Sequence, residues 1–167
     1  MTNLSRRRMI GAAIGTVSVV TLAGCAGDDD TGDDDGDDAD GDDPVPPEMD
    51  AFLTENEARL YDGTIEDATG TDEVVVAVGA GDGGLAFDPP ALRIDAGTTV
   101  VWEWTGDGGA HNVASTEESS SDFESGSAVD DADETFEQSF DDDGLQYYRC
   151  TPHQTVGMYG AIEVLDG

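Results

Sequence analysis

The sequence is organised around the nine residues Cys150-Thr-Pro-His153-Gln-Thr-Val-Gly-Met158. They offer a thiol, an imidazole and a thioether, with two residues between Cys150 and His153 and four between His153 and Met158. Sulfur and imidazole ligands suit copper in a trigonal site with two histidines, one cysteine and a long axial methionine, and such sites transfer electrons. The only other histidine of the chain is His111. We therefore predict a copper site whose ligands are His111, Cys150, His153 and Met158.

Short strand-like segments surround these residues. Residues 98–105 alternate most clearly, with Val100, Trp102 and Trp104 on one face, and His111 follows soon after. Residues 145–149 run directly into Cys150. The other expected strands are 73–78, 85–87, 91–95, 135–140 and 159–165. Many short strands with little helix favour an all-β fold, an antiparallel β-sandwich. The polar stretch 115–133 shows no hydrophobic periodicity from which its structure or its position in the fold could be predicted.

The first 26 residues read as an export signal, which begins with arginines and continues with the apolar run 9–23. This run of 15 residues is shorter than the roughly 20 that a membrane-spanning helix needs. Arg6-Arg7-Arg8 resembles a twin-arginine signal, and Leu22-Ala-Gly-Cys25 resembles a lipobox, in which Cys25 would carry the lipid. An uncleaved membrane anchor is the alternative, and in both cases the rest of the chain faces outward.

Residues 27–48 are dominated by aspartate and glycine and end in a proline-rich segment, which is typical of a disordered tether. A calcium-binding loop does not fit them, because no register with glycine at the sixth position has an acidic residue at the first. Residues 49–71 are expected to form an N-terminal extension with a short helix capped by Asp50. The folded domain is then expected to span residues 72–167.

The charge is strongly one-sided: 39 acidic residues stand against six arginines and no lysine, for a formal net charge of −33. Binding to nucleic acid is excluded as a function, because neutralising phosphates requires lysine and arginine. At about 1 M salt the screening length falls to about 3 Å, so most of this repulsion would disappear. The composition therefore indicates a halophilic protein.

The strand 98–105, the segment His111-Asn112-Val113, and Cys150-Thr-Pro-His153 with Met158 together resemble the cupredoxins, and most nearly the halocyanins of haloarchaea. The resemblance covers about residues 61–164. It implies a Greek-key β-sandwich with one copper ion, which carries single electrons between membrane-associated redox proteins as donor and acceptor. It also implies attachment to the extracytoplasmic face of the cell membrane through a lipid on Cys25.

The resemblance further implies that Asn112 ties the His111 loop to the Cys150 loop; an ordinary turn residue is the alternative. Pro152 would stiffen the ligand turn through its fixed φ, and Gly157 and Gly160 would permit the sharp turn around Met158.

One position departs from the family. Several relatives have an aromatic residue before the copper cysteine, whereas Arg149 stands here, after Tyr147 and Tyr148. We therefore expect electrons to pass through the solvent-facing edge of His153 rather than through a tyrosine.

Each predicted ligand also has an ordinary structural interpretation. Taken singly, a cysteine or methionine is more often a core residue, and a histidine an ordinary surface group. Together, both histidines and Cys150 would have to fall in cupredoxin positions by coincidence. A multicopper oxidase or copper nitrite reductase needs more than two histidines, so an enzyme is not expected. Because the chain has two cysteines, a disulfide between Cys25 and Cys150 is possible on their number alone. Copper storage or delivery outside the cytoplasm stays open as the alternative function.

Overall fold

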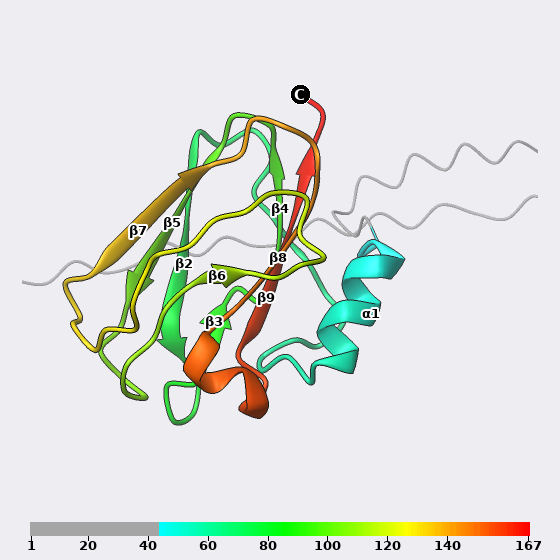
Figure 1. Ribbon diagram of the computed structural model, residues 1–167. Coiled ribbons are helices and arrows are strands. Elements are labelled where there is room, and N and C mark those ends of the chain that lie inside the picture. The colour runs from blue at the N-terminus through cyan, green and yellow to red at the C-terminus, as the bar shows by residue number, and fades with distance from the viewer. Residues whose placement is uncertain (1–43) are drawn as a thin grey trace, which may run out of the picture. The chain divides into compact units, whose positions relative to one another are not determined.

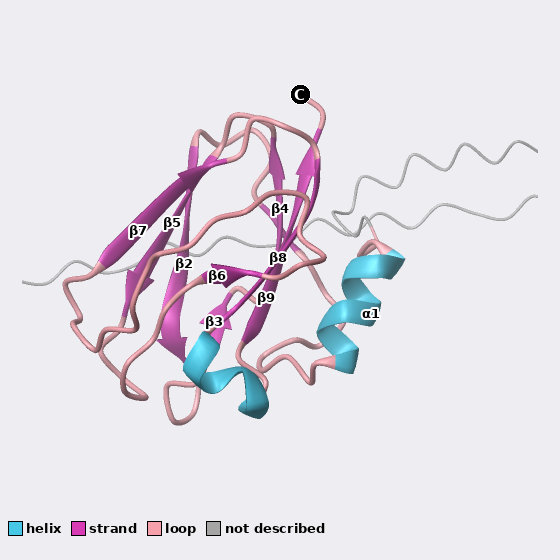
Figure 2. Ribbon diagram, in the orientation of Figure 1, coloured by secondary structure: helices cyan, strands magenta, loops and turns pink. Residues whose placement is uncertain are grey.

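The computed structural model describes residues 44–167; the predicted signal, Cys25 and nearly all of the predicted tether lie outside this part of the chain. Residues 44–167 form two β-sheets that pack face to face, with one α-helix against the outer face of the first sheet (Figures 1 and 2). This architecture confirms the expected all-β sandwich.

The strands lie where alternation predicted them, within one or two residues. The first sheet contains, in spatial order, β1 (Glu66–Asp67), β4 (Ala91–Asp95), β9 (Tyr159–Leu165), β8 (Gly144–Arg149) and β6 (Ala114–Ser115). The second contains β3 (Ala86–Asp88), β2 (Glu73–Ala80), β5 (Thr99–Trp104) and β7 (Thr135–Ser139). Strands β1 and β6 were not expected, because two residues are too few to show an alternation.

The pairing of strands is mixed rather than purely antiparallel. Strands β2 and β5 run parallel, as do β4 with β9 and β1 with β4. The pairs β2–β3, β5–β7, β6–β8 and β8–β9 are antiparallel. Parallel neighbours need a long crossover connection, and the chain between β2 and β5 supplies one by passing through β3 and β4. Hydrophobic alternation defines faces and not directions, so the sequence could not reveal this.

Trp102 of β5 lies at the centre of the core and is fully buried. Its ring centroid lies 5.4 Å from that of Phe136, 5.5 Å from Tyr148 and 5.7 Å from Phe123. Phe123 belongs to the polar stretch 115–133, which the sequence left unplaced. Ser121 of the same stretch donates hydrogen bonds from its backbone and hydroxyl groups to Gln146 Oε1. The stretch is therefore anchored to the sandwich by one aromatic ring and by hydrogen bonds.

Helix α1 (Pro47–Glu55) covers the outer face of the first sheet (Figure 1). Met49 and Leu53 are fully buried there, against a small apolar cluster. The helix begins two residues earlier than expected, after Pro46, and Asp50 is not its cap. Instead, the Asp50 carboxylate accepts a hydrogen bond of 2.7 Å from the Tyr61 hydroxyl. Burying two such side chains contributes about 1.5–3 kcal/mol each, which is enough to hold a short helix on the sheet.

Candidate metal centre

Three potential metal ligands from two separate parts of the chain converge at one end of the sandwich. Cys150 directly follows β8, and His153 lies in the short 3₁₀ helix η1 (Thr151–Val156), the orange helix at the lower end of Figure 1. His111 comes from the loop after β5. Cys150 Sγ lies 3.6 Å from His111 Nδ1 and 3.4 Å from His153 Nδ1, and the two Nδ1 atoms are 3.1 Å apart. All three donor atoms thus face one point.

His111 is fully buried, and its ring is fixed in one tautomer. The Nε2 atom lies 2.8 Å from the backbone carbonyl oxygen of Asp107. A carbonyl only accepts hydrogen bonds, so this contact selects the neutral tautomer with the proton on Nε2, whose Nδ1 lone pair faces Cys150. The His111 backbone pairs with Val129 in both directions, at 2.8 and 2.9 Å, and its carbonyl accepts a bond from the Trp104 indole.

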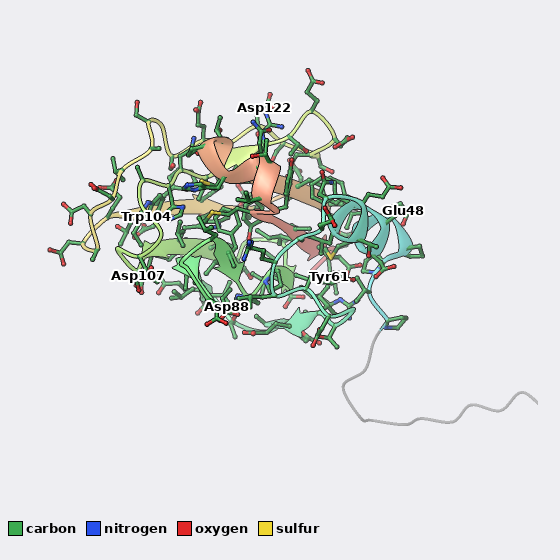
Figure 3. The ribbon with its side chains drawn as sticks, turned by 90° about the horizontal axis from the view of Figure 1, so that it is seen from below. Glu48, Tyr61, Asp88, Trp104, Asp107 and Asp122 are labelled. Atoms are coloured by element: carbon green, nitrogen blue, oxygen red, sulfur yellow. The ribbon has the colours of Figure 1, made fainter. Side chains whose placement is uncertain are left out.

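Figure 3 views the sandwich from this end and shows Trp104 and Asp107 on the same side of it. Neither contact with His111 was predicted from the sequence. The Asp107 group is a backbone carbonyl, which any residue supplies, so no side-chain signal could have identified it.

Cys150 is a free cysteine and is fully buried. Burial raises the pKa of its thiol, and the backbone amides of Asn112 and His153 act in the opposite direction by hydrogen bonding to the sulfur. A metal must therefore displace a proton to bind the thiolate, which makes metal affinity increase with pH.

His153 is the only one of the three donors that is partly exposed. Burial and the neighbouring His111 lower its pKa, so the ring is neutral at pH 7 and its Nδ1 atom is available as a ligand. The two imidazole centroids are 4.7 Å apart. One edge of the site thus reaches solvent, through His153.

Asn112 connects the loops that carry the ligands. Its Oδ1 accepts a hydrogen bond of 2.8 Å from the Thr151 backbone amide, and its Nδ2 lies 3.3 Å from Thr151 Oγ1. Nδ2 also donates to the Gly126 carbonyl at 3.2 Å. These bonds link the position after His111 to the position after Cys150. Pro152 lies exposed in the first turn of η1.

Met158 is fully buried in the same core cluster as Cys150. Its backbone carbonyl accepts a bond of 3.0 Å from the Cys150 amide, and its own amide donates to the His153 carbonyl at 3.3 Å. The backbone of the ligand turn therefore closes on itself, and Met158 lies in the same buried cluster as Cys150.

The two glycines near Met158 have different roles. Gly157 ends η1 with φ of +84°, the left-handed conformation that glycine adopts without strain. Gly160 lies within β9 and does not adopt a left-handed φ. A Cβ atom there would overlap the ring of Tyr148. The expectation that both glycines make the turn was therefore wrong for Gly160, which permits close packing instead.

The donor set fits copper. Two neutral imidazoles and one thiolate are the ligands of trigonal blue-copper sites, and donor atoms 3.1–3.6 Å apart suit one metal ion with bonds of about 2.0–2.3 Å. His111, Cys150 and His153 form the one group of three or more histidine, cysteine, aspartate or glutamate side chains within residues 44–167 that could hold a metal. In the same part of the chain, no helix is long and apolar enough to cross a membrane.

Comparison with known proteins agrees with this chemistry. Residues 74–165 match the family described as "Copper binding proteins, plastocyanin/azurin family". The chain is 57% identical to halocyanin from Natronomonas pharaonis, over 98% of this chain and 99% of that protein. It is 35% identical to plastocyanin from Scenedesmus fuscus, over 55% of this chain and 99% of that protein.

Solved structures of cupredoxins are also similar. Pseudoazurin from Methylobacterium extorquens is 28% identical with a TM-score of 0.45, covering 57% of this chain and 77% of that one. The extent of the family match and the identity to halocyanin confirm the resemblance read from the ligand motif. The chain therefore belongs to the plastocyanin/azurin family of copper-binding proteins, the cupredoxins, which bind one copper ion.

Proposed function

We propose that the protein is a one-electron carrier whose blue copper site is formed by His111, Cys150, His153 and Met158. The observation that carries the proposal is the convergence of His111 Nδ1, Cys150 Sγ and His153 Nδ1, with separations of 3.1–3.6 Å. Bound there, copper supplies one-electron chemistry between its Cu(II) and Cu(I) states, with a thiolate bond that absorbs visible light.

The protein's own part is to hold the ligands in place before the metal arrives. The Asp107 carbonyl fixes the His111 ring, and Asn112 fixes the Cys150 loop relative to it. Ligands that are oriented by such partners need little rearrangement when the charge of the metal changes. This rigidity supports rapid electron transfer.

The route of the electron is proposed to pass through His153. His111 and Cys150 are fully buried, whereas His153 is partly exposed and Val156 beside it is an exposed apolar side chain. Tyr148 offers no alternative exit, because its ring is fully buried in the core. A redox partner is expected to dock over the apolar surface around His153.

We further propose that the protein works at the outer face of the cell membrane, tethered by a lipid on Cys25, between membrane-associated redox proteins. The support is the signal-like, lipobox-like and Asp/Gly-rich composition of residues 1–43, together with similarity to a halocyanin over nearly the whole chain. A tether raises the local concentration of the carrier near such partners.

The function is tested by adding Cu(II) to the apoprotein. We expect one copper per chain, an intense visible band and a reversible one-electron voltammogram. We also expect slow loss of copper to an excess of a chelator, because two of the three donors are fully buried. A colourless product contradicts the carrier proposal, and rapid loss of copper to the chelator favours storage or delivery.

Stability is expected to rise with salt. The screening length falls from about 10 Å at 0.1 M to about 3 Å at 1 M ionic strength, which relieves repulsion among 39 acidic residues. The urea midpoint of the apoprotein, measured from 0.1 to 3 M KCl, should therefore increase steadily. A midpoint that does not change with salt contradicts the halophilic interpretation.

A further inference from the structure

The segment that follows helix α1 lies against the ligand turn. We call residues 56–61 the strap. The Arg59 backbone amide donates a hydrogen bond of 2.9 Å to the Gly157 carbonyl, and its guanidinium Nε donates one of 2.8 Å to the Val156 carbonyl. A single residue of the strap thus binds two successive carbonyls between His153 and Met158.

The contact between the strap and the turn is close. A Cβ atom on Gly157 would overlap the Glu57 carbonyl oxygen, so the two backbones meet without a side chain between them. The strap is itself held by α1: the Ala58 amide donates to the Leu53 carbonyl at 2.8 Å, and Tyr61 bonds to Asp50. Figure 3 shows Tyr61 beside α1. The turn is therefore braced by an element that is packed on the sandwich.

The backbone of the strap is strained on both sides of Arg59. Glu57 has φ of +49° and Leu60 has φ of +65°, although neither is glycine. A left-handed conformation costs such residues about 1–2 kcal/mol each. Strain of this kind persists where the surrounding structure enforces it, and it gathers at functional sites. Here the two strained residues flank Arg59, the residue that binds the ligand turn.

We propose that Arg59 is a positioning residue for the metal ligands. Its bonds to the carbonyls of Val156 and Gly157 hold the end of η1, and through it they fix His153 and Met158 relative to Cys150. The 3₁₀ helix has poor internal hydrogen-bond geometry, so a donor from outside adds rigidity that the turn lacks. The proposal rests on the copper site proposed above.

The strap, including Arg59, lies outside the part of the chain that matches the plastocyanin/azurin family model, since that match begins at residue 74. The similarity to halocyanin covers 98% of this chain. Arg59 thus adds to the cupredoxin domain a contact from the N-terminal extension.

The test compares three variants of the full-length protein. Arg59→Met removes the guanidinium and keeps the backbone bond to Gly157. Arg59→Lys keeps the charge but lacks the Nε–H group. Ala51→Glu is the control, because it changes the net charge by the same −1 as Arg59→Met at an exposed position of α1.

The first readout is amide hydrogen exchange of residues 153–158 in the apoprotein. We expect exchange to accelerate about fivefold in both Arg59 variants, the ratio that loss of one typical hydrogen bond gives, and to stay unchanged in Ala51→Glu. Exchange in Arg59→Met that equals the control overturns the proposal. The proposal is also overturned if residues 153–158 of Arg59→Lys exchange at the wild-type rate, because the positive charge alone would then be enough to hold the turn.

The second readout is the reduction potential and the visible spectrum of the copper-loaded protein. Both Arg59 variants should shift the reduction potential and the position of the visible band, and Ala51→Glu should shift neither. An unchanged potential in both Arg59 variants overturns the positioning role. Failure of the copper-site proposal is recognised separately, because the wild type would then give no visible band, whereas the exchange experiment requires no copper.

Discussion

Replacing Cys150 with serine is expected to abolish the visible band of the copper-loaded protein and to leave the sandwich folded. The sulfur lies next to both imidazole Nδ1 atoms, at 3.4 Å from His153 and 3.6 Å from His111. A serine hydroxyl is a harder ligand that is not ionised at neutral pH, so it does not supply the thiolate bond. Copper affinity should fall by more than the about 10- to 100-fold that loss of an outer hydrogen-bond partner costs.

The fold should survive this change because serine is similar in size to cysteine. Burying one hydroxyl costs about 1–3 kcal/mol, which a domain stable by about 5–15 kcal/mol tolerates. Far-ultraviolet circular dichroism and titration with Cu(II) measure the two effects. Thr155→Ser serves as the control, since Thr155 is exposed on the same turn. A band of wild-type intensity in Cys150→Ser would remove Cys150 from the site.

Replacing Gly160 with alanine is expected to destabilise the fold by overpacking its core. The added methyl group would overlap the Tyr148 ring. That ring cannot move aside, because its centroid lies 4.8 Å from that of Phe87 and 5.5 Å from that of Trp102. Overpacking of a dense core costs about 1–3 kcal/mol. The free energy of unfolding, measured with urea at fixed molar salt, should fall by about this amount.

Two further variants separate overpacking from a backbone effect. Gly167→Ala is the control, because a Cβ atom at Gly167 meets only the Ala96 carbonyl, at an ordinary distance of 3.9 Å. The double variant Tyr148→Leu/Gly160→Ala should be more stable than the sum of the two single losses predicts, since the smaller side chain makes room. Strictly additive losses would show that the Tyr148 ring is not the obstacle.

The fold was predictable where short-range patterns dominate. The alternation read in residues 98–105 predicted β5 (Thr99–Trp104) to within one residue at each end, and the strand expected at 159–165 matches β9. The parallel pairing of β2 with β5 was not predictable, because it depends on how distant segments return to the sheet. The burial of Phe123 was missed for the same reason, since one aromatic residue in a polar stretch shows no period.

The candidate site was likewise predictable in part. Side chains that are rare in this chain, its two histidines and Cys150, could be found by their type and spacing. Asn112, which binds the Thr151 amide, was expected from the resemblance, but the carbonyl of Asp107 that orients His111 belongs to the backbone and has no signature in the sequence. Arg59 was equally hidden, because only the tertiary structure brings α1 and the strap against the ligand turn.

The pairing of His111 with Val129 connects the acidic stretch 115–133 directly to a predicted metal ligand. This stretch leaves the sandwich just beyond the first ligand and returns to pair with that same ligand. At low salt the carboxylates of the stretch are less screened and repel one another more strongly, which we expect to weaken the pairing between Val129 and the loop that carries His111. Desalting is therefore expected to weaken copper binding as well as the fold, so that ionic strength would affect the occupancy of the site and not only its stability.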